Sequence, residues 1–256
     1  MRMNGTKGLL VGVLLAGMLG GCATQGNKDP LESMNRGIYK FNDTVDKAAI
    51  KPIAGAYKAV VPSPLRTGVN NFFTNLGTVV TLINDLLQLK LDKAMTDAGR
   101  LAINSTFGIG GLIDVASMDN IDKNNEDFGQ TLGYWGWTDS TYLVLPLLGP
   151  STLRDTGGLV VDSAFFDPLY YIEDVPARNS AIALKFVDRR SQYLPASDLL
   201  DEAALDPYAF MRDAYMQRRN SQVHDGNGPQ EKWDDAEDEE PAPAVASAEP
   251  AKNEAK

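Results

Sequence analysis

The side chains that most often do chemistry are scarce in this chain. Of its 256 residues only one is cysteine, Cys22, and only one is histidine, His224. With these two the chain can build no internal disulfide, no Ser-His-Asp triad in its body, no HExxH or multi-histidine metal site, and no CxxC centre. A GxxxxGK[ST] phosphate loop and a GxSxG nucleophile turn are also missing. We therefore expect no catalytic residue, no bound metal and no dissociable cofactor.

Carboxylates are the groups with which acid–base chemistry stays open. Asp155, near Ser151, and Asp162 are the candidates. We interpret Ser151 as the N-cap of a helix and the neighbours Arg154 and Asp155 as a structural ion pair. The sequence thus predicts a protein that is not an enzyme, with a carboxylate-dependent hydrolase as the less favoured alternative.

The single cysteine follows an export signal. A basic start with Arg2 and Lys7 precedes the apolar run 8–19, which is too short to cross a bilayer of about 30 Å as a helix. Leu19-Gly-Gly-Cys22 looks like a bacterial lipobox. That likeness implies cleavage of residues 1–21, diacylglycerol on the Cys22 thiol, and an acyl chain on the new amine. Two or three chains anchor a protein firmly to a membrane.

Composition divides the mature chain into three parts. Residues 22–28 form the acylated cysteine and its tether, 29–222 a helical body, and 223–256 an acidic tail rich in Ala and Pro that we expect to be disordered. Hydrophobic residues make up 43% of the chain, which indicates a globular body. The formal net charge of −10 disfavours nucleic acid as a partner.

Capping residues before proline mark four helix starts in the body. They are Asp29-Pro30, Ser63-Pro64, Asp167-Pro168 and Asp206-Pro207. Apolar residues then recur three or four positions apart, as in 31–45 and 65–87. The pattern predicts an all-α fold of short amphipathic helices, with 142–145 as the best strand. Such helices usually bury the apolar face in their own core, and contact with a bilayer is the alternative.

Glycines interrupt one apolar stretch of the body. Gly108, Gly110 and Gly111 fall within four positions, and each glycine costs about 1 kcal/mol inside a helix relative to alanine. We expect a helical hairpin with an apolar tip there, and an ordinary interhelical turn is an equal alternative on periodicity alone. Further on, we place Trp135 in the core and leave its neighbours Tyr134 and Trp137 open between core and membrane interface.

Five blocks of residues, in order, resemble the MlaA (VacJ) lipoproteins, and the resemblance covers about 29–219. They span 29–42 (DPLESMNRGIYKFN), 104–116 (NSTFGIGGLIDVA), 128–133 (FGQTLG), 145–155 (LPLLGPSTLRD) and 206–215 (DPYAFMRDAY). The signature residues of the first block are Asp29, Pro30, Asn35, Arg36, Phe41 and Asn42.

The resemblance implies an outer-membrane lipoprotein anchored in the periplasmic leaflet, where it maintains lipid asymmetry. It would pass mislocalised phospholipids from the outer leaflet to a soluble periplasmic carrier, beside a porin trimer. The implied fold is a ring of amphipathic helices lying in the membrane around a central channel. The glycine hairpin matches the segment that lines the channel: Phe107, Gly108, Ile109, Gly110, Gly111, Leu112, Ile113 and Val115. A lipid-anchored structural adaptor of the envelope is the alternative.

Overall fold

The computed structural model describes residues 29–227. The predicted signal, Cys22, the tether and the tail after residue 227 lie outside the described residues. The first residues assigned to the tail stay with the helical body, because Val223 is a buried residue of the last helix and Asp225 binds two lysines.

The described part of the chain is mostly helical, as predicted. Its α-helices are α2 (Glu32–Val45), α3 (Lys51–Val60), α4 (Ser63–Leu87), α5 (Leu91–Thr106), α6 (Val115–Met118), α7 (Phe128–Tyr134), α8 (Leu153–Val161), α9 (Val175–Ala203) and α10 (Pro207–Val223). Shorter helical turns are η1 (Asp46–Ile50), η2 (Asp162–Phe166) and η3 (Pro168–Tyr171). Within residues 29–227 no helix combines the length and the hydropathy that crossing a bilayer requires.

One β hairpin interrupts the helices. β1 (Tyr142–Leu145) pairs antiparallel with β2 (Gly149–Thr152), with Tyr142 opposite Thr152. The first strand is the one that the sequence predicted. The second was missed because it begins with Gly149 and Pro150, two residue types that are depleted in strands.

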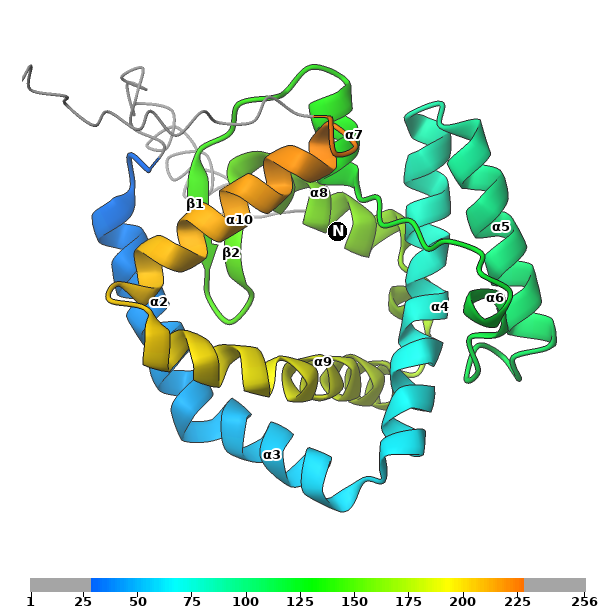
Figure 1. Cartoon of the computed structure of the whole chain (residues 1–256), viewed down its shortest axis with the longest axis horizontal. Helices are drawn as coiled ribbons and strands as arrows, with labels where there is room; N and C mark the ends of the chain where they lie inside the picture. The colour runs from blue at the N-terminus through cyan, green and yellow to red at the C-terminus, as the bar shows by residue number, and fades with distance from the viewer. Residues whose placement is uncertain (1–28, 228–256) are drawn as a thin grey trace, which may run out of the picture.

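Figure 1 shows how the elements lie relative to one another. In this view α2 lies on the left, α3 at the bottom and α4 on the right, with α5 and α6 further right, and α10 and α7 lie toward the top. The long helix α9 packs along α3, and α5 lies against the outer side of α4. The tip of the β hairpin points toward α9. A ring-like assembly within a membrane stays a prediction.

Polar side chains fill much of the interior, and hydrophobic ones cover much of the outside. Across residues 29–227 the buried polar and charged side chains outnumber the buried hydrophobic ones. On α4 the exposed fractions of Leu65, Phe72 and Leu86 are 62, 36 and 49%. The buried residues of that helix are Phe73, Asn75, Thr78, Thr81, Asn84 and Asp85. Large exposed apolar surfaces mark contact with a membrane or with another protein.

Two of the predicted helix starts have the expected capping contact. The Asp167 carboxylate accepts a hydrogen bond from the Leu169 N–H at 2.9 Å, and the Asp206 carboxylate accepts one from the Ala209 N–H at 3.1 Å. At 63–64 the residue before the helix is Pro62, and no side chain caps it. The Asp206 contact fixes where α10 begins, and α10 carries Tyr215 and Arg219, which bind the Asp155 carboxylate.

Two other predicted caps are wrong. α2 begins at Glu32, and Asp29 is instead a buried acceptor that the Asn35 amide binds at 2.8 Å. The residue that caps α8 is Thr152, whose hydroxyl accepts from the Asp155 N–H at 3.1 Å, and not Ser151.

Candidate functional site

Two signature asparagines fasten the β hairpin to α2. The Asn35 amide donates to the Tyr142 carbonyl at 3.1 Å and accepts from the Val144 N–H at 2.9 Å. Asn42 lies two turns further along the same face of α2. Its amide donates to the Leu145 carbonyl at 2.9 Å and accepts from the Leu147 N–H at 2.8 Å. These four bonds hold the outer edge of β1 and aim the hairpin tip.

The other charged signature residues join α2 to α10. The Arg36 guanidinium binds the Asp206 carboxylate through both terminal nitrogens, at 3.2 and 2.7 Å, and lies 4.3 Å from the centre of the Tyr208 ring. The Tyr208 hydroxyl donates to the buried Asp29 carboxylate. Phe41, in contrast, is 52% exposed. The resemblance therefore identified residues that hold α2, the β hairpin and α10 together, but it did not identify the space between these elements.

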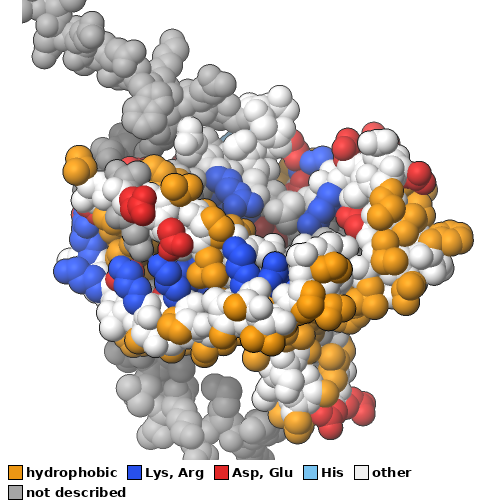
Figure 2. All heavy atoms as spheres, turned by 60° about the horizontal axis from the view of Figure 1, so that its bottom comes forward, with side chains coloured by type: hydrophobic (Ala, Val, Ile, Leu, Met, Phe, Trp, Pro, Cys, Tyr) orange, Lys and Arg blue, Asp and Glu red, His pale blue; other side chains and the backbone are white. Residues whose placement is uncertain are grey.

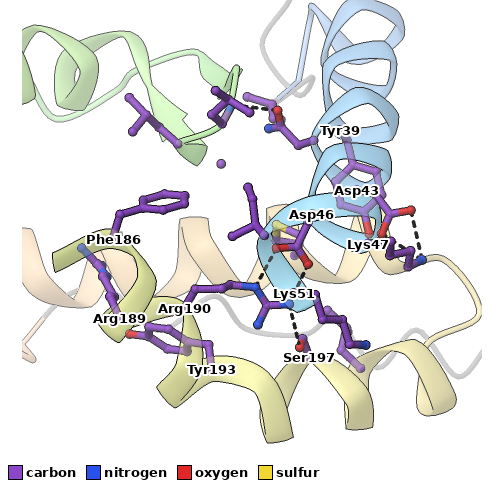
Figure 3. Close-up of a pocket in the computed structure, with 18 residues that line it drawn as sticks. Tyr39, Asp43, Asp46, Lys47, Lys51, Phe186, Arg189, Arg190, Tyr193 and Ser197 are labelled. Atoms are coloured by element: carbon purple, nitrogen blue, oxygen red, sulfur yellow. Dashed lines mark hydrogen bonds and ion pairs between the residues drawn. The ribbon is translucent and has the colours of Figure 1, made fainter. Parts of the chain in front are cut away.

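A cavity of about 310 Å³ lies between α2, η1, the hairpin tip and α9 (Figure 3). Its wall combines basic, acidic and apolar side chains: Tyr39, Asn42, Asp43, Asp46, Lys47, Ile50, Lys51, Val144, Leu147, Leu148, Gly149, Phe186, Arg189, Arg190, Tyr193, Ser197, Leu200 and Met211. We call it the α2–α9 cavity. Its size and mixed lining suit an amphipathic ligand.

Most charges on this wall are neutralised in pairs. Arg190 binds the Asp46 carboxylate through two nitrogens, each at 2.7 Å, and also the Ser197 hydroxyl at 3.2 Å. Two lysines of the wall are paired as well. Lys47 binds Asp43 at 2.9 Å, and Lys51 binds Asp198 at 2.7 Å.

The α9 wall of the cavity was not predicted from the sequence. Phe186, Arg190, Tyr193 and Ser197 follow one another at steps of three or four positions, and Arg189 lies three positions after Phe186 and four before Tyr193, so the five residues share one face of α9 (Figure 3). That spacing was the available signal. It was hard to notice because this face mixes aromatic, basic and hydroxyl side chains, and because a proline, Pro195, lies inside the helix.

Figure 2 shows the same polarity on the surface. Lys and Arg side chains gather along the near rim of a central hollow. Hydrophobic side chains gather at the right of that view, on the side where Figure 1 places α5 and α6.

The glycine segment forms a tight turn, as the sequence predicted. α5 ends at Thr106, and Gly110 and Gly111 have φ of 67° and 92°. A side chain at Gly111 would also collide with Asn75, whose Nδ2 lies 2.6 Å from an added Cβ. The second arm of the expected hairpin is only the four-residue α6.

This turn lies away from the α2–α9 cavity, and its role as channel lining stays a prediction. None of its residues belongs to the cavity wall. Asn71 and Asn75 of α4 bind the Leu112 carbonyl at 3.2 Å and the Ser105 hydroxyl at 3.0 Å, which fixes the turn on the outer side of α4. Its large apolar side chains project outward, with exposed fractions of 75, 68, 45 and 40% for Phe107, Ile109, Leu112 and Ile113.

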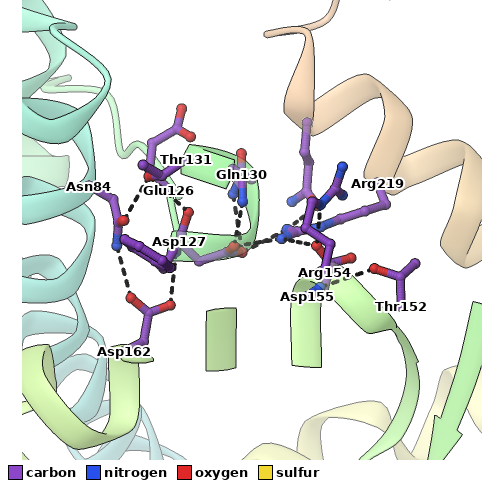
Figure 4. Close-up of polar contacts among 12 residues, drawn as sticks. Asn84, Glu126, Asp127, Gln130, Thr131, Thr152, Arg154, Asp155, Asp162 and Arg219 are labelled. Carbon is purple, nitrogen blue, oxygen red and sulfur yellow. Dashed lines mark hydrogen bonds and ion pairs between the residues drawn. The ribbon is translucent and has the colours of Figure 1, made fainter. Parts of the chain in front are cut away.

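The carboxylates with catalytic potential are held in a structural network (Figure 4). Asp155 accepts from Arg154, Arg219 and Tyr215, each at 2.9 Å, so the predicted ion pair of Arg154 and Asp155 is confirmed. Burial opposes the charged form of Asp155, yet the Arg219 guanidinium holds the pKa of this carboxyl below its usual range. Asp162 accepts from the Asn84 amide at 3.0 Å.

The prediction that Trp135 is a core residue is wrong. Its exposed fraction is 56%. Its indole N–H donates to the Leu87 carbonyl at 3.2 Å, and its ring meets the Phe128 ring edge-on, so these contacts hold it at the surface. Tyr134 and Trp137 are also exposed, by 52 and 44%.

Two further buried carboxyl groups lie close together between α4 and α5. Asp85 and Asp97 are 0 and 1% exposed, and no N–H or O–H of the described residues binds either carboxylate. Burial, together with the neighbouring Asp97 carboxyl, raises the pKa of Asp85 to about 7. Asp85 therefore carries a proton in part of the molecules near neutral pH.

We expect Asp85→Asn to stabilise the protein at pH 8 and to lose much of this advantage at pH 5. Because the folded pKa is above the unfolded value, folding takes up a proton between about pH 4 and 7, so the wild type gains stability as the pH falls through that window. The gain from the variant at pH 8 should be about 1–3 kcal/mol. Urea unfolding of both proteins at the two pH values measures it. Asp92→Asn, at an exposed position of α5, is the control, and an equal effect of Asp85→Asn at both pH values would contradict the raised pKa of Asp85.

Comparisons with known proteins agree with one another. The family model described as MlaA lipoprotein matches residues 27–222. The intermembrane phospholipid transport system lipoprotein MlaA of Haemophilus influenzae is 36% identical over 232 residues, covering 86% of this chain and 92% of that protein. The protein of the same name from Escherichia coli K12 is 36% identical over 212 residues, covering 79 and 83%. An uncharacterized protein of Rickettsia prowazekii is 35% identical over 195 residues, covering 76 and 78%.

A solved structure is similar as well. It is described by the words "Structural basis for maintenance of bacterial outer membrane lipid asymmetry" and superposes with a TM-score of 0.67 at 34% identity. The match covers 76% of this chain and 98% of the other.

Proposed function

This chain belongs to the MlaA lipoprotein family, and from that premise we propose that it works in intermembrane phospholipid transport to maintain the lipid asymmetry of the outer membrane. It takes phospholipids mislocalised in the outer leaflet and passes them along an amphipathic path to a soluble periplasmic carrier. It performs no chemical reaction on them. The carrier and a porin trimer beside the protein are the partners that we propose.

The distribution of polarity is the observation that carries this proposal. Side chains such as Asn75, Thr78 and Thr81 are buried, while Leu65 and Phe72 of the same helix are exposed. Apolar surface gains about 25 cal/mol per Å² when it leaves water, so this exterior is favoured against acyl chains. A phospholipid headgroup crossing bare hydrocarbon loses its hydration at a high free-energy cost. The mixed wall of the α2–α9 cavity offers a headgroup polar contacts on its way.

We further propose that Cys22 carries the diacylglycerol and acyl chains that hold the protein in the periplasmic leaflet of the outer membrane. The exposed apolar side chains of the glycine turn between α5 and α6, Phe107 and Ile109 among them, then contact acyl chains. In this arrangement the anchor keeps the helical body at one depth, and the cavity opens toward the headgroup region.

Deletion of the protein should increase the phospholipid at the cell surface, measured as lipid hydrolysed by a phospholipase added outside intact cells. The wild-type gene should restore the low level. Cys22→Ala should restore it poorly and should move the protein out of the membrane fraction, because the anchor is lost. An unchanged surface lipid level after deletion would refute the transport function, and a membrane-bound Cys22→Ala protein of unchanged mass would refute the anchor.

The same material separates transport from the alternatives. Radiolabelled phospholipid incubated with the purified full chain should be recovered intact, whereas cleavage products would indicate a hydrolase. Loss of detergent resistance in the deletion strain without a change in surface phospholipid would indicate a structural adaptor.

A further inference from the structure

We propose that Arg189 binds the phosphodiester group of a glycerophospholipid at the α9 wall of the α2–α9 cavity. This inference rests on the proposed function, because it names the part of the transported lipid that the cavity recognises. Arg189 lines the cavity and is an exposed residue, on the same face of α9 as Phe186 and Tyr193 (Figure 3).

The charge balance of the cavity singles out Arg189. Lys47, Lys51 and Arg190, the other cations of the wall, are each paired with an aspartate, as described above. For Arg189 the part of the chain from 29 to 227 provides neither an ion pair nor a side-chain hydrogen bond. Its charge is therefore the one on this wall that a ligand can neutralise.

The chemistry of a guanidinium matches a phosphodiester. Its N–H groups form a planar fork that binds two phosphate oxygens at once, and such charge-assisted bonds are stronger than neutral ones. Tyr193, one turn further along α9, adds a hydroxyl donor on the same side. A phosphodiester carries one negative charge, so binding at Arg189 leaves the wall locally neutral.

The remaining wall favours a lipid over free phosphate. Leu147 and Leu148 at the hairpin tip, with Phe186 and Leu200 on α9, place apolar surface beside the guanidinium. Free phosphate gains nothing from these side chains, whereas the glycerol backbone and the first methylenes of the acyl chains do.

The contacts also predict little selection among headgroups. Asp43 and Asp46, the carboxylates of the wall, are already bound to Lys47 and Arg190. A headgroup amine therefore finds no unpaired carboxylate on this wall. The group that the cavity recognises is the phosphodiester, which is common to phospholipids. Phosphatidylglycerol and phosphatidylethanolamine should bind alike.

Photocrosslinking to the purified, lipidated full chain in detergent micelles tests this. The probes are phosphatidylglycerol, phosphatidylethanolamine and diacylglycerol, each with the same photoreactive acyl chain. Arg189→Gln should lower the labelling by both phospholipids about tenfold and leave the weak labelling by diacylglycerol unchanged. Arg189→Lys, which keeps the charge without the fork, should fall in between. The matched control is Arg178→Gln, on α9 but outside the cavity wall, which should label like the wild type.

Several outcomes would overturn the inference. Equal phospholipid labelling of the wild type and Arg189→Gln would do so, and so would diacylglycerol labelling as strong as that of the phospholipids. Displacement of the phospholipid by inorganic phosphate in excess would reassign Arg189 to the free anion. Thermal unfolding of Arg189→Gln at the wild-type temperature would show that its loss of labelling is not a loss of fold.

The two proposals can fail separately. If the deletion strain exposes surface phospholipid but Arg189→Gln binds lipid normally, transport stands and the assignment of Arg189 fails. If Arg189-dependent binding is found but deletion leaves the surface unchanged, the binding site stands and the transport function fails.

Discussion

Arg219→Met should destabilise the protein by about 3 kcal/mol, since it removes the cation shared by the buried Asp155 carboxylate and the partly exposed Asp127 carboxylate. The Arg219 side chain is 9% exposed and reaches from α10 to Asp127 at 2.5 and 2.6 Å and to Asp155 at 2.9 Å (Figure 4). Burial disfavours the charged forms of both acids, but Arg219 holds the pKa of each below its usual range.

The effect of Arg219→Met should depend on pH with a definite sign. Because the folded pKa values of Asp127 and Asp155 are depressed, the stabilisation is complete at pH 7 and is lost as the pH falls through those values, below about pH 4. Urea unfolding of the purified full chain should therefore show a large difference from the wild type at pH 7 and a smaller one at pH 3.

Two further variants control the Arg219 experiment. Arg218→Met, at the exposed neighbouring position of α10, should change stability by less than about 0.5 kcal/mol. Adding Asp127→Asn to Arg219→Met should recover part of the loss, because it removes the charge of Asp127, which pairs with Arg219, whereas Asp155 keeps its ion pair with Arg154. A double variant no more stable than Arg219→Met would contradict the electrostatic explanation.

Gly158→Ala and Gly157→Ala should change stability in opposite directions, although the two glycines are neighbours on α8. An added Cβ at Gly158 would lie 2.3 Å from the backbone nitrogen and 2.7 Å from the Cα of Gly129, where α7 and α8 touch backbone to backbone. Backbone atoms cannot rotate aside, so we expect a loss of about 3 kcal/mol. At Gly157 an added Cβ meets nothing within 4 Å, and alanine should stabilise the helix by up to about 1 kcal/mol.

Thermal unfolding of the three proteins in one detergent would measure this difference. The Gly158 variant should melt below the wild type and the Gly157 variant at or above it. Similar shifts in both variants would mean that helix propensity, and not the contact between α7 and α8, controls this position.

Local patterns were predictable from the sequence because they depend on neighbouring residues. The Asp-Pro starts at 167 and 206, the strand at 142–145 and the tight glycine turn are all cases in which the signal and the structure lie within a few positions. The family followed from several such blocks in order. The missed cap at 29 shows the limit, because a distant partner, Tyr208, competes for the Asp29 carboxylate.

The site depends on contacts between distant segments, and for that reason the sequence alone did not reveal it. Asn35 and Asn42 belong to a recognisable block, but their partners lie in a hairpin more than 100 positions away. The side of α4 on which the glycine turn rests depends on Asn71 and Asn75, whose spacing says nothing about their partners. Arg189 becomes conspicuous only when the cations around it are seen to be paired.

The asparagine contacts to β1 also bear on aggregation. A two-stranded sheet normally leaves N–H and C=O groups unpaired along its outer strand, and another chain can extend it there. Here the amides of Asn35 and Asn42 already occupy the Tyr142 and Leu145 carbonyls and the Val144 N–H, in the manner of a third strand. Two side chains thus protect the hairpin from intermolecular β-pairing while its tip stays uncovered.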